Sequence, residues 1–95
     1  MSISVFEIGD SRMFTFVSSV APDSAPTFKV TGIVGTVIAS ITATQSDSTN
    51  FYTMYTMPTS QGFYIGEWFA QKTVIGSTFD FVSRFVFRID NTRIP

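Results

Sequence analysis

Residues 78–89 read TFDFVSRFVFRI, and this stretch decides the fold class. One of its faces carries apolar side chains with a single serine among them: Phe79, Phe81, Ser83, Phe85, Phe87 and Ile89. The other face carries all of its charged residues: Asp80, Arg84 and Arg88. Such alternation with period two is typical of a β-strand that lies between a core and water. We therefore predict a strand here and place its four phenylalanines in the core.

The same alternation continues through most of the chain, and turn-forming residues interrupt it about every dozen positions. Leu is absent and strand-favouring residues dominate, so we expect no long helix. The pattern predicts seven strands, at 3–8, 12–20, 27–31, 36–44, 51–57, 63–72 and 78–89. The third and fourth should form a hairpin, and Phe14 and Phe16 should join the core. With 95 residues the chain is long enough for one core, so residues 1–95 are predicted to form a single all-β domain.

Charge is sparse in this chain. Charged residues make up 14% of it, against about 25% in an average soluble protein, and the net charge is −1. The basic residues are scattered, so we expect no nucleic-acid partner. A surface so poor in charge is weakly protected against association, which favours a protein partner that covers part of it. The alternative is a Thr-rich monomer.

The residue types needed for most active sites are missing. Without Cys and His, the chain has no disulfide, no thiolate nucleophile, no sulfur-based zinc site and no Ser-His-Asp relay. The carboxylates Glu7, Asp10, Glu67, Asp80 and Asp90 are interpreted as solvated charges. We predict no catalytic, cofactor or metal site. A small hydrolase remains an alternative only if two carboxylates meet in a cleft.

The beginning of the chain has neither a basic region nor an apolar core of the kind that signal peptides carry, and no segment has the roughly 18 apolar residues of a membrane helix. We therefore expect synthesis in the cytoplasm, without export and without a membrane partner.

The segment 51–57 differs from the other strands because it is apolar on both faces. Phe51, Tyr55 and Met57 form one set, and Tyr52 and Met54 form the other. Tyr and Met are enriched at protein interfaces, so we predict that Tyr52 and Met54 contact a partner. Alternatively, a terminal segment of the same chain covers them. The tail 90–95 is a candidate docking arm, with Arg93 and Ile94 as candidate contacts.

The stretch 60–68, SQGFYIGEW, resembles the start of strand F in immunoglobulin-type domains. There a Tyr two positions after a Gly forms a tyrosine corner, in which its hydroxyl bonds back to the preceding turn. The resemblance implies an immunoglobulin-like antiparallel β-sandwich of about seven strands, without a disulfide because Gly66 stands where antibody domains have Cys. It also implies that Tyr64 and Trp68 face the core and Glu67 faces solvent. Taken alone, the stretch also fits an ordinary turn before an aromatic strand, and the number of strands favours the sandwich.

Nearly the whole chain also resembles a group of small bacteriophage virion proteins. The matching segments are Phe6–Asp10, Met13–Phe16, Pro26–Val30, Gly62–Trp68 and Phe85–Phe87. This resemblance implies a structural protein of the virion that binds the capsid surface, the neck or the tail. Its partners would be other virion proteins, bound in many symmetric copies.

A glycan-binding or adhesive module is the alternative function. In it, exposed aromatic residues such as Trp68 or Tyr55 would stack on sugar rings. The orientation of Trp68 separates the two functions, because an inward-facing Trp68 belongs to the core.

Overall fold

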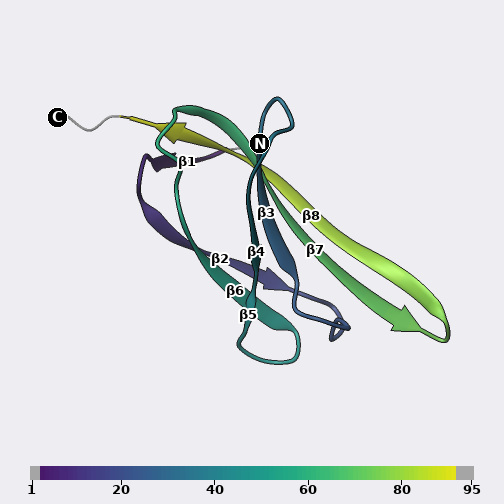
Figure 1. Cartoon of the computed structure of the whole chain (residues 1–95). Coiled ribbons are helices and arrows are strands. Elements are labelled where there is room, and N and C mark those ends of the chain that lie inside the picture. Colours follow the sequence, from purple (N-terminus) through teal and green to yellow (C-terminus); the bar gives the residue numbers. More distant parts are fainter. Residues whose placement is uncertain (1–2, 92–95) are drawn as a thin grey trace.

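The computed structural model describes residues 3–91, which form strands and connecting turns without a helix (Figure 1). The strands are β1 (Ser4–Glu7), β2 (Ser11–Val17), β3 (Thr27–Gly32), β4 (Val37–Thr42), β5 (Thr44–Gln45), β6 (Asn50–Thr56), β7 (Gly62–Val74) and β8 (Ser77–Asp90). The prediction of an all-β chain is confirmed for this part of the sequence. Six of the seven predicted strands correspond to one observed strand each, and the predicted strand 36–44 corresponds to two, β4 and β5, so the described residues form eight strands rather than seven.

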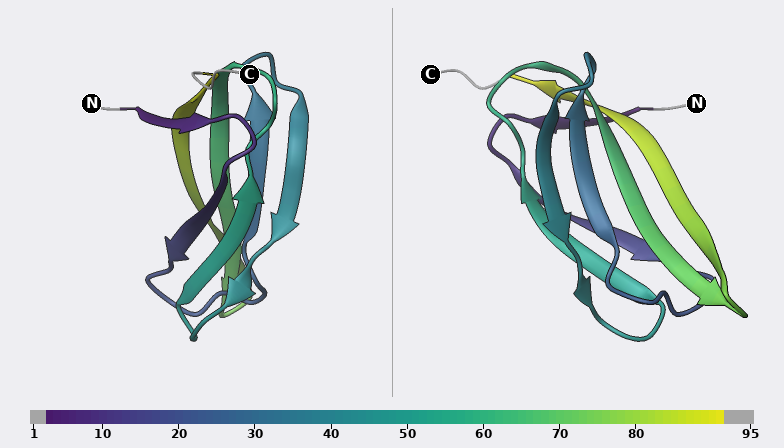
Figure 2. Two further views of the ribbon diagram at one scale, coloured as in Figure 1. Left: turned by 90° about the vertical axis from the view of Figure 1, so that its left-hand side faces the viewer. Right: turned by 45° about the vertical axis from the view of Figure 1, so that its right-hand side comes forward.

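The strands form two sheets that pack face to face (Figure 2). The larger has the order β1-β8-β7-β3-β4, and the smaller has the order β2-β6-β5. The predicted hairpin is present as the antiparallel pair β3–β4. The chain changes sheets near Ala43, whose N–H donates to the carbonyl of Pro26 at 2.9 Å. The predicted strand 36–44 is therefore divided into β4 in one sheet and β5 in the other.

The larger sheet is mixed, which corrects the prediction of an antiparallel sandwich. Strand β1 runs parallel to β8, with Ser4 opposite Phe87 and Glu7 opposite Asp90. Parallel neighbours need a long connection between them, because a tight turn can only reverse the chain. Here nearly the whole domain connects them, since β1 and β8 are the first and last strands in the chain.

Aromatic side chains fill the space between the sheets. Phe28 is fully buried at the centre, and its ring centroid lies 4.9 Å from those of both Phe14 and Trp68. Phe14 and Phe16 are half-buried and reach the core from the smaller sheet, where Phe16 stacks on Trp68. Fully burying a side chain of this size contributes about 1.5–3 kcal/mol, so this cluster is the main source of stability.

The last strand lies only partly over the core. Phe87 is fully buried and half-buried Phe85 packs against it, but Phe79 is 54% exposed and half-buried Phe81 lies outside the core cluster. The prediction was wrong for Phe79 and incomplete for Phe81. The alternation of side chains is as predicted, yet the β7–β8 hairpin extends past the end of the smaller sheet (Figure 1). Within residues 3–91, no opposing sheet covers its inner face there.

Tyr64 makes the hydrogen bond expected of a tyrosine corner. Its side chain is buried, and its hydroxyl donates to the carbonyl of Ser60 at 2.7 Å. Trp68 is also buried, as predicted, so the register of β7 places the expected residues inward.

Candidate interaction surfaces

The turn of the β7–β8 hairpin holds a residue in an unfavourable conformation. Val74 and Ser77 are paired, so the turn has two central residues, Ile75 and Gly76. Their φ angles of 49° and 77° are both positive, as in a type I′ turn. Asn-Gly is the favoured pair there, whereas an L-residue with a branched Cβ is strained by about 1–2 kcal/mol. Ile75 is nevertheless 99% exposed, so no burial within the chain offsets this strain.

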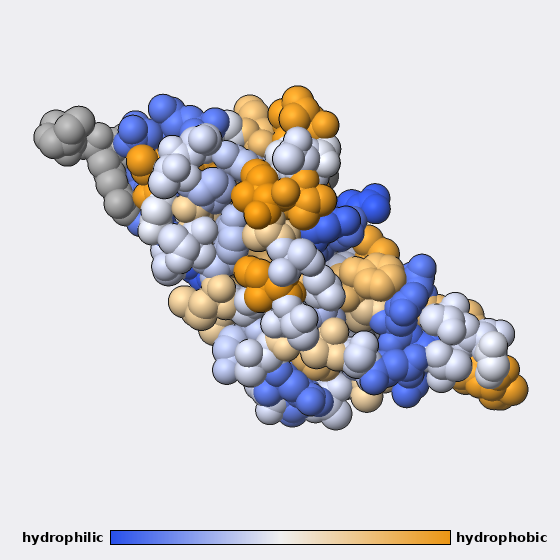
Figure 3. All heavy atoms as spheres, in the orientation of Figure 1, coloured by the Kyte–Doolittle hydropathy of each residue, from blue (hydrophilic) through white to orange (hydrophobic). Residues whose placement is uncertain are grey.

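Two more apolar side chains near this turn are open to solvent. Val74 is 47% exposed and Phe79 is 54% exposed. With Ile75 they make up what we call the hairpin overhang, and apolar atoms are visible at this far end of the hairpin in Figure 3. The sequence predicts a turn at this point but gives Ile75 no role. The signal it offers is the pair Ile-Gly where Asn-Gly is typical.

The loop between β2 and β3 braces the overhang. The N–H of Asp23 donates to the carbonyl of Gln71 at 2.8 Å, and the hydroxyl of Thr73 donates to the Asp23 carboxylate at 2.8 Å. Hydrogen bonds to the carboxylate from the hydroxyl and the backbone N–H of Thr73, together with the charge of Lys72 at 4.0 Å, lower the pKa of Asp23 below its ordinary value. The base of the overhang is therefore tied to the rest of the domain.

A second apolar surface lies on the outer face of the smaller sheet. Met13 and Met54 are directly opposite each other in the β2–β6 pair and are 59% and 57% exposed. Val17 is 69% exposed, and Tyr52 is half-buried on the same face. We call these four residues the methionine patch. It contains both residues of β6 predicted to contact a partner, and no described segment covers Met54.

The other two predicted contacts, Arg93 and Ile94, lie outside the described residues, as does most of the candidate docking arm 90–95. Its first residue, Asp90, ends β8.

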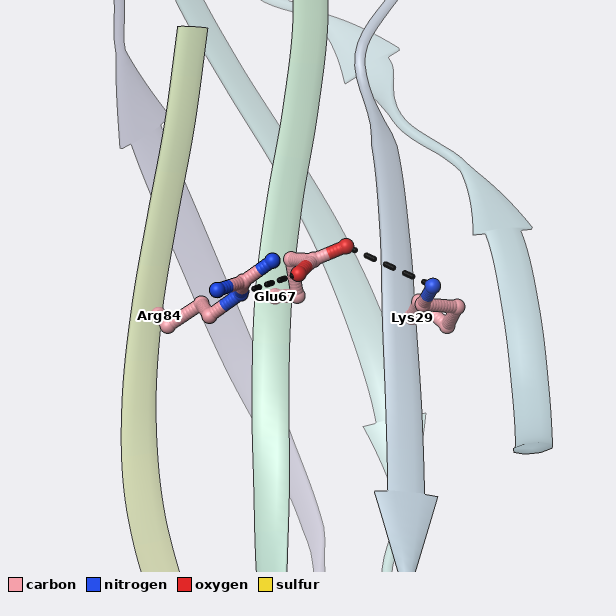
Figure 4. A network of polar contacts seen from close by, with 3 residues as sticks. All are labelled: Lys29, Glu67 and Arg84. Atoms are coloured by element: carbon pink, nitrogen blue, oxygen red, sulfur yellow. Dashed lines mark hydrogen bonds and ion pairs between the residues drawn. The ribbon is translucent and has the colours of Figure 1, made fainter. Parts of the chain in front are cut away.

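The outer face of the larger sheet carries three charged residues in contact (Figure 4). The carboxylate of Glu67 accepts a hydrogen bond from Nε of Arg84, and the ammonium of Lys29 lies 3.4 Å from its other oxygen. The hydrogen bond from Arg84 and the two positive charges lower the pKa of Glu67. Glu67 faces outward as predicted, but its side chain is only 14% exposed, so the prediction of a solvated carboxylate was wrong here. The two cations cover it.

This trio borders a shallow groove of about 500 Å³ that Thr27, Phe69, Asp80 and Val82 also line. Both cations of the trio contact the same carboxylate, that of Glu67, on the strand between them. We therefore interpret the trio as cross-strand stabilisation of β3, β7 and β8.

The aromatic residues considered for sugar stacking lie in the core. Trp68 is 3% exposed and Tyr55 is 8% exposed, and burial raises the pKa of the Tyr55 hydroxyl. Neither ring offers a face to a ligand. Within residues 3–91, no group of three metal-ligating side chains comes together.

Comparison with known proteins gives no match: no family model, no curated protein and no solved structure is significantly similar to this chain. In the described part of the chain, no helix is long and apolar enough to cross a membrane.

Proposed function

We propose that this chain is a non-catalytic, immunoglobulin-like interaction domain that docks its hairpin overhang into an apolar pocket of a partner protein. Two features support the immunoglobulin-like assignment. The arrangement of five strands opposite three resembles that of immunoglobulin domains, in which strands equivalent to β3, β7 and β8 share one sheet and those equivalent to β2, β5 and β6 share the other. The bond from Tyr64 to Ser60 is the second feature.

The conformation of Ile75 is the observation that carries the proposal. An exposed, β-branched side chain at positive φ destabilises the isolated domain, and residues with this kind of strain cluster at functional sites. Burial of the same side chain in a partner would recover about 1.5–3 kcal/mol, which is comparable to or larger than the strain of about 1–2 kcal/mol. Because the turn is fixed and braced, little entropy is lost when it docks.

The charges near the overhang favour a protein over a lipid surface. The only described charged residues on or beside this end of the hairpin are Lys72, Asp23 and Asp80, which together are net negative. An anionic membrane would repel this end, whereas an apolar pocket on a protein would not.

For the larger context, we propose a structural role in a bacteriophage virion, on the capsid surface, the neck or the tail. The support is the sequence resemblance together with the low charge of the chain. In such an assembly many copies bind at once, so a small contact like the overhang suffices through avidity.

The test uses Ile75→Asn, which creates the favoured Asn-Gly turn. We expect this variant to melt about 4–8 °C higher, because about 1 kcal/mol of strain is removed, and to lose binding to purified virions in co-sedimentation. The matched control is Val34→Asn, since Val34 is 87% exposed at the turn of another hairpin. This control should bind like the wild type.

Equal binding by wild type and Ile75→Asn would contradict the docking mode. The virion context is tested separately, by mass spectrometry of particles of the phage that encodes the chain. Its absence from those particles would contradict the structural role.

A further inference from the structure

Strand β8 has a long free edge. Among the described residues 3–91, strand β1 pairs only with residues 87–90, so residues 77–86 have a paired neighbour on one side only, namely β7. Alternate residues of an edge strand point their N–H and C=O groups away from the sheet, where they can bond another strand. Eight of these ten residues are exposed, and the other two, Phe81 and Phe85, are half-buried.

This edge lacks most of the usual protection against strand addition, although Asp80 and Arg84 give it two charges of opposite sign. Natural edges are shortened, bulged, or blocked by Pro and Lys. Residues 77–86 contain no Pro, Lys or Gly, and the β7–β8 register has no shift along its length. The opposite edge, β4, is only six residues long, and its pairing is irregular at Val30 and Thr31.

We propose that a second copy of this chain pairs with the free edge, so that the two β8 strands run antiparallel about a two-fold axis at Val82. Residues 78–86 of each copy take part. The two larger sheets then become one continuous sheet. This interface is formed by the edge of β8 rather than by the turn; it shares Phe79 with the overhang, and it does not depend on the proposed function.

Charge complementarity supports this partner and this register. With Val82 opposite itself, Asp80 of each copy lies opposite Arg84 of the other, which gives two cross-strand ion pairs. On the inner face, Phe79 of each copy lies opposite Phe85 of the other. Moving the axis to Asp80 or to Arg84 would place like charges opposite each other, which is destabilising.

The side chains are positioned for these pairs. Arg84 uses its Nε for Glu67, and its side chain is 68% exposed, so its terminal amino groups can reach a carboxylate on the next strand. The Oδ1 atom of Asp80 accepts a hydrogen bond from Gln71 on its own sheet, which orients the carboxylate. Strand β1 occupies the edge from Phe87 onward, and this limits the pairing to the segment before it.

The first experiment is disulfide trapping. Because the natural chain has no Cys, only the introduced cysteine can form a cross-link. In the proposed dimer the two Val82 Cα atoms are about 5.5 Å apart, within the range that a disulfide spans. Oxidised Val82→Cys should therefore run as a covalent dimer.

Val86→Cys is the matched control, because Val86 is on the same face of the same strand and is similarly exposed, at 42% against 48%. Its two copies would be about 27 Å apart along the strands. Equal cross-linking of both variants, or of neither, would overturn the proposal.

The second experiment exchanges the charges, with Asp80→Lys in one preparation and Arg84→Glu in another. Each variant alone would put like charges opposite each other and should self-associate at least about tenfold more weakly than wild type in sedimentation equilibrium. Mixing the two restores opposite charges at both positions, so a heterodimer should form. Circular dichroism verifies that each variant is folded. Failure of the mixture of folded variants to associate, or a wild type that stays monomeric, would overturn the register and the dimer respectively.

Discussion

Gly66 offers the sharpest test of how the two sheets pack. It lies on the inner face of β7, directly opposite Phe85 in the β7–β8 pair. A Cβ atom added at Gly66 would lie 2.4 Å from Cζ of Phe85 and 2.8 Å from both Cε atoms. The ring has little room to move, because Phe14 and Phe28 stack against it with centroid distances of 5.7 and 6.1 Å. We therefore predict that Gly66→Ala destabilises the domain.

The magnitude follows from two opposing effects. Overpacking of a core costs about 1–3 kcal/mol, whereas replacing Gly by Ala within a strand gains about 0.5–1 kcal/mol of backbone entropy. The net cost is about 1–2 kcal/mol, which for a domain of this size lowers the melting temperature by about 5–15 °C.

A double-mutant cycle with Phe85→Ala tests the cause. Phe85→Ala alone should cost about 3 kcal/mol, at the low end for phenylalanine because the ring is half-buried. In that background the ring is gone, so Gly66→Ala should become stabilising by about 0.5–1 kcal/mol. The coupling free energy is then about 1.5–3 kcal/mol, measured by urea unfolding followed by circular dichroism.

Gly32→Ala is the control for Gly66→Ala. A Cβ at Gly32 would have only ordinary contacts, the nearest at 3.8 Å, so this substitution should be neutral or slightly stabilising. If Gly66→Ala unfolds like wild type, or costs the same with and without the Phe85 ring, the described packing of Phe85 on Gly66 is wrong.

Two further predictions concern single polar interactions. Tyr64→Phe removes the hydrogen bond to Ser60 and should cost about 0.5–1.5 kcal/mol in urea unfolding; an unchanged midpoint would show that this bond adds nothing. The second concerns acid. The folded state holds the pKa of Glu67 below its ordinary value, so the unfolded chain takes up the proton first as the pH falls. The stability that Glu67 provides is thus present at neutral pH and lost below about pH 5. Between pH 7 and pH 3, the melting temperature should fall less steeply for Glu67→Gln than for wild type. An equal fall in the two proteins would exclude this contribution.

The positions of the strands could be predicted because side-chain alternation is a local property of the sequence. The Tyr64 hydrogen bond could also be predicted from the sequence, since its Gly-x-Tyr pattern spans only three residues. The exposure of Phe79 could not be predicted in this way, because burial depends on what lies opposite a residue. What lies opposite is fixed by the relative lengths of strands in different sheets. Strands β7 and β8 have 13 and 14 residues, whereas β2 and β6 have seven, so the longer pair must extend past the core. Unequal strand lengths were thus the signal for the overhang.

Strand β8 divides its residues between stability and association. From Phe85 onward its inner side chains pack in the core and its edge is soon closed by β1, whereas before Phe85 its inner side chains lie outside the core cluster and its edge has no paired neighbour among residues 3–91. A hairpin cut to the length of the core would keep most of the packing energy and lose both proposed contacts. The extra residues include an exposed phenylalanine, Phe79, and a strained isoleucine, Ile75, and they leave an edge open to other strands. On the proposed function and the proposed dimer, the residues that make this hairpin less stable are the ones that would contact a partner.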